Sequence, residues 1–479
     1  MRNLFVFLAI FSPCINAETS GDLDKTFATK GLYVEGTSFP QQEFLGLATA
    51  VDSQGRILVL HAIEVTNDYG VGVYRLLTDG TKDNTYTTIA SQVDKFLIDG
   101  KFSIAVDAND GVFFAYSNYT CTAPDTDCQQ DVFVRHFDNT GALTGSQTIA
   151  FDLGSTYLRQ NDIFADLVYI PNTYGYSTEM IAIAATVDYS NVNDTDFGVA
   201  LMDVANDGSI SMRTTFSDDG KRTCAFDQDI NNSGVGIDQA VKIIVERFAP
   251  LQMIIGGNAF EGNGANNNGW NLAFCEVGVV GNINQSWSTN TLPDTLNNVE
   301  LLQDMYYSSY ENDVERLIVG AKFSTGNDND FYLGEYLSSS WVFDTNFGTN
   351  GWASIGFSEL FIGDTNDEIQ SIIYKPNKTI AIAGNMGWTD NGDDFSKVAL
   401  ARFDQFGQLM TNWGDNGSKV FDFSQNTTGS QVTQVKDMAY DANKKELYLV
   451  GSSPDGSIKK DYVANILDNI DILFLNGFE

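Results

Sequence analysis

The sequence of 479 residues is poor in proline, histidine and basic side chains. Its 8 prolines stand against 43 glycines, which predicts many turns and few rigid linkers. With two histidines and no His-Glu-x-x-His motif, the chain offers no zinc site of the usual spacing. It also lacks a P-loop, a dinucleotide-binding fingerprint and a nucleophile elbow. These absences remove the common signatures of catalysis.

Basic residues are outnumbered by acidic ones, 27 against 63, which gives a net charge of −36. Such a surface excludes nucleic acid as a partner, because phosphates need basic groups, and it disfavours anionic membranes. Solubility is one explanation of this charge, and divalent cation binding is another.

Long apolar runs are missing after the first residues, so we expect no membrane span. Arg2 and the apolar run 4–11 are followed by Ala17, which predicts a signal peptide over residues 1–17. Attachment as a lipoprotein at Cys14 is the alternative, and Pro13 disfavours it. The mature chain is therefore expected to be exported to the periplasm, the cell surface or the medium.

The chain shows no long amphipathic helix, and its apolar residues form runs of three to six that are typical of strands. In the stretch 367–420 such runs alternate with turns and predict a four-stranded meander. We name its strands A to D. Strand A precedes each strand B, for example at 167–170, 305–307 and 438–440. Strand B recurs seven times, at 57–60, 112–116, 180–185, 253–257, 317–321, 380–384 and 447–451. Strand C also recurs seven times, at 71–77, 132–137, 197–202, 270–277, 331–337, 398–403 and 462–467.

Half-units stand at the two ends of this array. The phrase at 23–31 leads to a D strand with no A, B or C before it, and the C strand at 462–467 has no D after it. We therefore expect an all-β fold over residues 18–468, a single seven-bladed β-propeller of four-stranded antiparallel blades. Residues 31–35 should close the ring as the outermost strand of the seventh blade.

Four cysteines remain after cleavage of the signal peptide. Cys121 and Cys128 enclose a short polar loop, and in an oxidising compartment they should form a local disulfide. Cys224 and Cys275 lie in successive units, where a second disulfide would staple neighbours. Two buried free thiols are the alternative for this second pair.

Three phrases carry a resemblance. They are the aromatic-to-glycine phrase at 343–351, the run at 50–59 and the run at 399–407. Together they resemble the delta-60 repeat of secreted and surface proteins of bacteria. The resemblance implies a β-propeller without an assigned catalytic activity, and it covers nearly the whole mature chain. The second and fourth units depart from the pattern, and Trp287 stands where Phe-Gly is expected.

The last residues, 469–479, are expected to be a separate tail. They are similar to a Phe-x-x-Gly-Phe-Glu ending of exported proteins from some Gram-negative bacteria. The resemblance suggests a processing or sorting signal, and an apolar tail packed on the last blade is the alternative.

Acidic residues gather in the loops from strand B to strand C, and a propeller brings these loops to one face. Oxygen-rich loops suit calcium, and the candidate ligands are Asp328, Asp330, Asp393 and Asp394. The alternative is that these side chains cap their own turns.

Two functions remain open. The first is a non-enzymatic, exported scaffold, expected to be a monomer, that binds an unknown protein or glycan with one face. The second is a polysaccharide hydrolase or lyase that uses carboxylates of the central funnel. An acid–base cluster with perturbed pKa values at one end of the channel would favour the enzyme, and the sequence reveals none. His61 and His136 are expected to be packed, as are tryptophans such as Trp341 and Trp413, which could otherwise stack on sugars.

Overall fold

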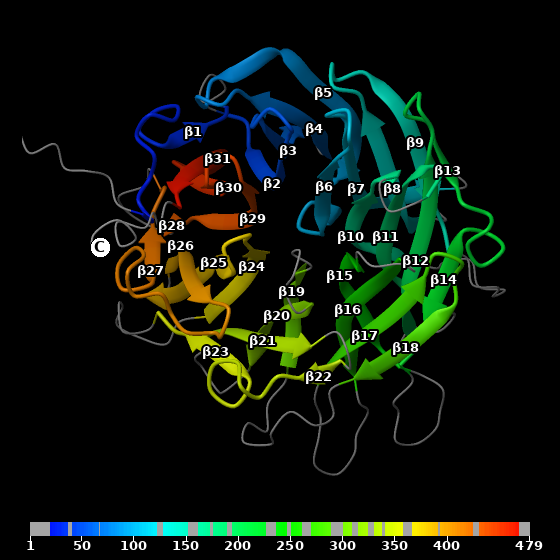
Figure 1. The fold of residues 1–479 in the computed structure, drawn as a ribbon. Coiled ribbons are helices and arrows are strands. Elements are labelled where there is room, and N and C mark those ends of the chain that lie inside the picture. The colour runs from blue at the N-terminus through cyan, green and yellow to red at the C-terminus, as the bar shows by residue number, and fades with distance from the viewer. Residues whose placement is uncertain are drawn as a thin grey trace, which may run out of the picture.

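The strands form seven antiparallel sheets that stand as blades around one axis, which is the seven-bladed β-propeller expected from the repeats (Figure 1). The computed structural model describes residues 20–36, 41–66, 68–121, 128–151, 161–172, 176–188, 194–226, 236–246, 251–260, 270–288, 300–308, 315–323, 330–337, 341–357, 366–390, 393–424 and 431–468. The expected signal peptide and the expected tail lie outside these residues.

From the axis outward, blades 1 to 6 run through consecutive strands of the chain, and blade 7 ends with the N-terminal β1. In blades 3, 5 and 6 two short strands both pair with the third strand, and the pairing of β28 with β26 is parallel. Blades 1 and 2 comprise β2 (Phe44–Val51), β3 (Ile57–Val65), β4 (Asp68–Leu76) and β5 (Lys82–Asp94), then β6 (Phe102–Val106), β7 (Val112–Cys121), β8 (Cys128–Phe137) and β9 (Leu143–Ile149). Blades 3 and 4 comprise β10 (Asp162–Ile170), β11 (Glu179–Asp188), β12 (Thr195–Val204), β13 (Ile210–Met212) and β14 (Lys221–Cys224), then β15 (Asp238–Glu246), β16 (Gln252–Phe260), β17 (Trp270–Gly278) and β18 (Ile283–Ser288). Blade 5 comprises β19 (Glu300–Ser308), β20 (Arg316–Phe323), β21 (Phe331–Leu337), β22 (Val342–Phe343) and β23 (Trp352–Ile355). Blade 6 comprises β24 (Asn366–Tyr374), β25 (Thr379–Asp390), β26 (Asp393–Asp404), β27 (Ser418–Phe421) and β28 (Gln431–Val432). Blade 7 comprises β29 (Gln434–Asp441), β30 (Glu446–Asp455), β31 (Ile458–Leu467) and β1 (Leu32–Val34).

The only helical element in these ranges is the three-residue 3-10 helix η1 (Lys95–Leu97), between blades 1 and 2. Within the described residues, no helix is long and apolar enough to cross a membrane.

Both faces of the middle strands are buried, which explains the unbroken apolar runs of the sequence. In β25, Ile380 and Ile382 pack into the cluster shared with blade 5, whereas Ala381 and Ala383 face blade 7. Alternate residues of a strand point to opposite faces of the sheet, so each face covers one neighbouring blade. Each fully buried aliphatic side chain of this kind contributes about 1.5–3 kcal/mol.

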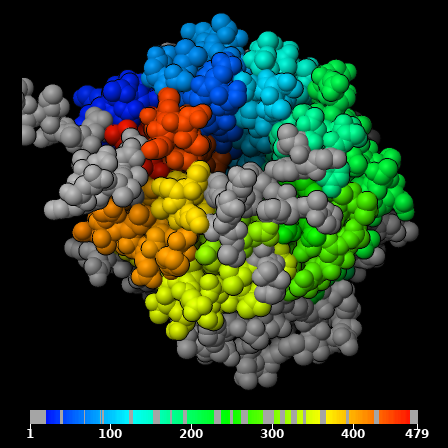
Figure 2. All heavy atoms as spheres, in the orientation of Figure 1, coloured from blue at the N-terminus to red at the C-terminus, as the bar shows by residue number. Residues whose placement is uncertain are grey.

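The N-terminal segment closes the ring, as expected. β1 pairs with β31 in antiparallel register, with Leu32 opposite Ala464 and Val34 opposite Tyr462. The segment before β1 adds a backbone hydrogen bond from the Leu467 amide to the Asp22 carbonyl, 2.9 Å long. The blue N-terminal and red C-terminal segments consequently lie side by side (Figures 1 and 2).

The aromatic-to-glycine phrase is a docking element between blades. Its aromatic residue is buried in all four copies, Phe27, Phe216, Phe347 and Trp413. The amide after the aromatic donates to a carbonyl in a turn of the next blade, as from Ala28 to Asp79 at 2.8 Å and from Gly348 to Phe406 at 2.8 Å. The receiving turn has a glycine at positive φ, and at Gly80 an added Cβ would lie 2.7 Å from the Ala28 nitrogen. The repeat phrase therefore encodes the joint between blades rather than a ligand site.

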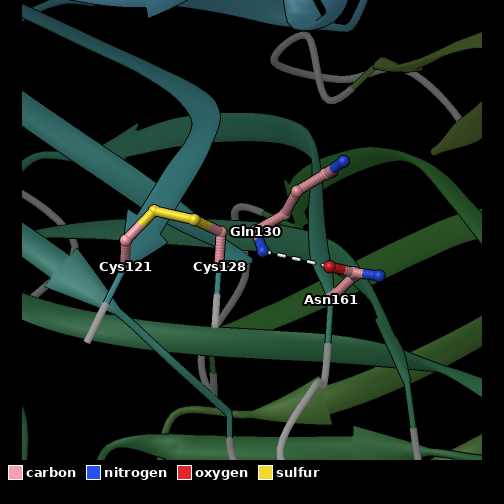
Figure 3. The surroundings of a disulfide bond; sticks show 4 residues. All are labelled: Cys121, Cys128, Gln130 and Asn161. Atoms are coloured by element: carbon pink, nitrogen blue, oxygen red, sulfur yellow. Dashed lines mark hydrogen bonds between the residues drawn. A yellow bond between two sulfur atoms is a disulfide. The ribbon is translucent and has the colours of Figure 1, made fainter. Parts of the chain in front are cut away.

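Both expected disulfides are present. Cys121 and Cys128 join the ends of β7 and β8 within blade 2, close to a hydrogen bond from the Gln130 amide to Asn161 Oδ1 (Figure 3). Cys224 on β14 and Cys275 on β17 connect blades 3 and 4, which confirms the second disulfide and rules out the alternative of two free thiols for this pair.

The sequence places Asp393 and Asp394 in a polar loop from strand B to strand C, at 390–394, and this prediction is wrong. β25 continues to Asp390 and β26 begins at Asp393, so Asp393 and Asp394 belong to a strand and two residues remain between the strands. The hairpin extends beyond the part of the blade that its neighbours cover. Its polar tip therefore lacks the apolar pattern that marks the buried part of a strand.

We predict that Gly80→Ala destabilises the protein by about 1–3 kcal/mol more than Gly456→Ala. Both glycines have positive φ, +80° and +67°, so both substitutions strain the backbone. A Cβ at Gly80 would clash with the docked Ala28, whereas one at Gly456 would meet nothing within 4 Å. Urea unfolding of the two variants measures the difference. Equal losses would mean that the docking contact contributes nothing.

We also predict that deletion of residues 18–36 destabilises the whole ring by several kcal/mol. The deletion removes β1 and the buried Phe27, and it leaves the outer edge of β31 without its partner. The control is Lys25→Ala, which alters an exposed side chain of the same segment. Calorimetry of both mature proteins tests the prediction, and an unchanged melting temperature in the deletion variant would contradict ring closure by this segment.

Candidate functional site: an axial hollow

The inner strands surround a hollow of about 270 Å³ on the ring axis. Its wall includes residues from all seven blades and from the connection between blades 1 and 2, which approaches the axis beside β6 (Figure 1). The lining residues are Leu47, Ile98, Asp99, Gly100, Lys101, Phe102, Ser103, Ala165, Asp166, Val241, Lys242, Gln303, Asp304, Gln370, Lys436 and Asp437. The hollow is therefore rich in charge, although it lies at the centre of an apolar ring.

A β-bulge repeats in the inner strands and aims side chains at the axis. Register shifts occur at equivalent points of β2, β10, β15, β19, β24 and β29, and β6 has none. The extra residues of these bulges include Gln303, Gln370 and Lys436, all of which line the hollow. A bulge re-aims the side chains around it. We call the extra residues of the bulges the first layer and the residues that directly follow them the second layer.

Aspartates of the second layer bind the next blade. Asp166 accepts a hydrogen bond from the Ile243 amide at 3.3 Å, and Asp304 accepts one from the Ile372 amide at 2.6 Å. Asp437 accepts one from the Thr49 amide of blade 1 at 2.9 Å. These aspartates come from blades 3, 5 and 7, so each joins its own blade to the following one.

Lys242 of blade 4 is the counterion of this layer. Its Nζ lies 3.6 Å from Asp166 Oδ2 and 3.3 Å from Asp304 Oδ1. Enclosure in the ring opposes its charge, but Asp166, Asp304 and Asp437 outweigh that effect and raise the pKa of Lys242. The lysine therefore stays protonated and occupies the place that a bound cation would take.

Two of these aspartates have a raised pKa. Removal from bulk water raises the pKa of Asp437 to about 6, although Lys242 and two backbone amides favour its ionised form. The same desolvation raises the pKa of Asp304. An acid–base cluster with perturbed pKa values therefore does exist in the channel, although the sequence did not reveal it.

The hollow is also lined by polar groups that take no part in the bonds of Asp166, Lys242, Asp304 and Asp437. Lys101 and Lys436 line the hollow, and neither lies within 4 Å of a carboxylate of the described residues. Gln303 accepts a hydrogen bond from the Ile369 amide through Oε1, which leaves its amide nitrogen for another partner. These groups give the hollow a binding capacity that Asp166, Asp304 and Asp437 lack.

The calcium candidates are not brought together in the described residues. Asp328 lies outside them, as does the side chain of Asp393. Asp330 of blade 5 lies against Gly356, and Asp394 of blade 6 accepts a hydrogen bond from Thr389. Within the described ranges no three acidic, histidine or cysteine side chains could hold a metal. The calcium site stays a prediction.

Other buried aspartates have a structural role. Asp162, Asp238 and Asp367 stand near the starts of inner strands and each accepts a hydrogen bond from a phenylalanine amide of the preceding blade. The donors are Phe151, Phe226 and Phe357. These acids fix the connections between blades.

Both histidines are packed, as expected. His61 lies edge-on against Tyr74 and 3.6 Å from the buried Asp461. His136 links Asp107 at 2.8 Å to the Gly208 carbonyl of blade 3 at 3.0 Å, beside a surface hollow of about 490 Å³. Trp413 is fully buried, and Trp341 is half-buried and donates to Glu276. These contacts join neighbouring blades.

The axial aspartates could not be recognised in the sequence, because the strands A expected there begin too late. Predicted strands at 167–170, 305–307 and 438–440 start one residue after Asp166, Asp304 and Asp437. A charged residue immediately before an apolar run, repeated in three units, was the available signal.

We predict that Lys242→Met destabilises the protein by about 3 kcal/mol at pH 7.5 and by less at pH 4.5. Loss of the lysine leaves Asp166 and Asp304 without their counterion. A raised aspartate pKa gives stability that is complete below about 3.9 and is lost as pH rises through the folded value, so the penalty grows with pH. Urea titrations at both pH values measure it. The control, Lys322→Met, breaks the surface pair with Glu368 and should cost under about 1 kcal/mol. A penalty that is independent of pH would contradict this account of Lys242.

Comparison with known proteins gives a likeness of fold. No family model matches the chain, and no curated protein matches its sequence. The polysaccharide lyase Uly1 is 10% identical over 88% of this chain and 90% of its own, with a TM-score of 0.47. The Dos1 propeller is 10% identical over 89% and 93%, with a TM-score of 0.40. Trypanosoma rangeli sialidase in complex with the inhibitor DANA is 9% identical over 81% and 57%, with a TM-score of 0.39. Likenesses at this level concern the fold and carry no argument about function.

Proposed function

We propose that this chain is an exported, non-enzymatic binding module, and that its ligand, a protein or a glycan, engages the end of the axial hollow. The proposal rests on the difference between the aspartates and the lysines that line the hollow. The carboxylates of Asp166, Asp304 and Asp437 are taken up by backbone amides and by Lys242. Free polar groups remain on Lys101 and Lys436. This arrangement offers a rigid site for recognition.

Export has support of its own. Disulfides persist in oxidising compartments, and two of them fit an extracellular or periplasmic protein. The apolar run before Ala17 adds the finer proposal of a cleaved signal peptide. Membership of the delta-60 repeat family is likewise a proposal, and it agrees with a function without catalysis.

An enzyme acting on polysaccharides is the second candidate, because Asp437 has a pKa of about 6. A carboxyl group with such a pKa can act as a general acid near neutral pH. A general acid must also reach its substrate within hydrogen-bonding distance. Both oxygens of Asp437 already accept hydrogen bonds, Oδ2 from the Thr49 amide and Oδ1 from the Met438 amide and Ser371. The binding function is therefore favoured.

One panel of soluble oligosaccharides separates the two candidates. We expect the mature protein to retain ligands on a glycan array and to release no reducing or unsaturated ends from the same panel. If no glycan binds, the ligand is a protein, and pull-down from the native medium identifies it. Asp437→Asn is the decisive variant. Cleavage by the parent protein that falls by at least about 100-fold in this variant, at unchanged melting temperature, would establish the enzyme and overturn the binding module.

A further inference from the structure

We propose that the axial hollow recognises an anionic, hydroxylated small molecule or chain end, of which sugar acids are the simplest examples, and that Lys101 and Lys436 bind its anionic group. The inference rests on the proposed binding function and names the ligand class for it.

The two lysines reach the hollow from different elements. Lys436 is the extra residue of the bulge in β29 of blade 7, and Lys101 directly precedes β6 of blade 2. Blade 1 lies between them and contributes the apolar Leu47 at the equivalent bulge. Two ammonium groups thus approach one hollow from either side of an apolar residue.

Lys101 is exposed and Lys436 is half-buried, and the repulsion between them makes this pair receptive to an anion. Burial, Lys101 and Lys459 all lower the pKa of Lys436, against the opposing influence of Asp99 and Glu368. None of these acids lies within the 4 Å of an ion pair with Lys436 in the described residues. A bound anionic group would supply the contact that Asp99 does not make, and it would relieve the repulsion between the lysines.

A cationic ligand has no such place beside the aspartates. Its place, between Asp166 and Asp304, is already occupied by Lys242. These aspartates also accept hydrogen bonds from the Ile243 and Ile372 amides. Between these two aspartates the hollow therefore has no place for a further cation, and the other charged groups of its wall include Lys101, Lys436 and Asp99.

The other lining groups favour hydroxyls on the ligand. Gln303 has its amide nitrogen to offer, and Gln370 contributes a second side-chain amide to the wall. A volume of about 270 Å³ is below the ~300–1,000 Å³ of typical small-molecule pockets, so the hollow suits a single sugar-sized unit. Phe96 is 88% exposed in η1, two residues from the lining Ile98, and offers a ring face on which the next unit of a chain can stack.

Three probes test the proposal by titration calorimetry on the intact mature protein: D-glucuronate, D-glucose 6-sulfate and D-glucose. We expect both anionic sugars to bind and D-glucose to bind at least about 10-fold more weakly. The double variant Lys101→Met/Lys436→Met should lose at least about 10-fold in affinity for the anionic sugars. It should melt as the parent protein does, since neither lysine is in an ion pair. The matched control is Lys95→Met, from the same connection, whose ammonium group pairs with Glu64 instead. It should bind as the parent does.

The outcomes distinguish this inference from the function beneath it. Equal binding of D-glucose and the anionic sugars, or unchanged affinity in the double variant, overturns the inference and leaves a binding module intact. Binding of the carboxylate but not the sulfate, or of both, supports it and identifies the acid group. If no probe binds the parent protein at 10 mM (roughly 3 kcal/mol of binding free energy), the anion site is wrong. If a glycan found on the array still binds after the residues that line the hollow are substituted, the proposed function is overturned as well.

Discussion

Each blade of this protein is completed by the next one, and the closed ring is the constraint on which the other features depend. A four-stranded sheet with both faces apolar cannot stand in water alone, so every blade requires two neighbours. The pairing of β1 with β31 supplies the last neighbour, and it joins residues more than 400 positions apart. Once the ring is closed, every inner strand has a fixed distance from the axis. The geometry of the axial hollow follows from that closure.

The same constraint explains where the buried charges lie. Backbone groups at the edges of neighbouring blades cannot pair with each other as strands of one sheet do, so side chains satisfy them. At the axis this task falls to aspartates such as Asp166 and Asp304. Near the opposite end of the third strand, arginines have this role in blades 1 and 6. Arg75 donates to the Asn139 carbonyl at 3.0 Å, and Arg402 donates to the Asp468 carbonyl at 3.1 Å.

His136 also joins two neighbouring blades. It occupies the place in blade 2 that Arg402 has in blade 6, and its ring contacts the Gly208 carbonyl of the next blade. Blade 2 lacks the aromatic-to-glycine phrase that docks other blades, and the histidine, with Thr144, fills that gap against Gly208. A lone histidine in this repeat is therefore a joint between blades.

The charged side chains near the axis differ in whether they have a structural partner. Most carboxylates near the axis and between the blades are bound to amides or to cations, and these bonds support the ring. In contrast, Lys101 and Lys436 contribute no ion pair to it. In a chain of this charge, basic groups without a structural partner are the features that most need a functional explanation.

Much of the fold could be predicted from the sequence because its information is local and repeated. Turn glycines, apolar runs and the phrase ending at Gly31 gave the number of blades and the closing strand. The axial site could not be predicted in the same way. Asp304, Lys242 and Lys436 are distant in the chain, and only the bulges, which carry no clear sequence mark, turn them toward one another. The polar tip at Asp393 was likewise assigned to a loop, because its strand continues beyond the buried part of the blade.

Native-state hydrogen exchange tests the central claim, ring closure, most directly. The amides of Asn465 and Leu467 donate to the carbonyls of Gly31 and Asp22, which belong to the opposite end of the chain. In a closed ring these two amides should exchange only through global unfolding, as slowly as the Leu449 amide in the middle of blade 7. Exchange at the rate of an unpaired, solvent-exposed edge strand, while Leu449 stays protected, would show that the ring is open and would contradict the account.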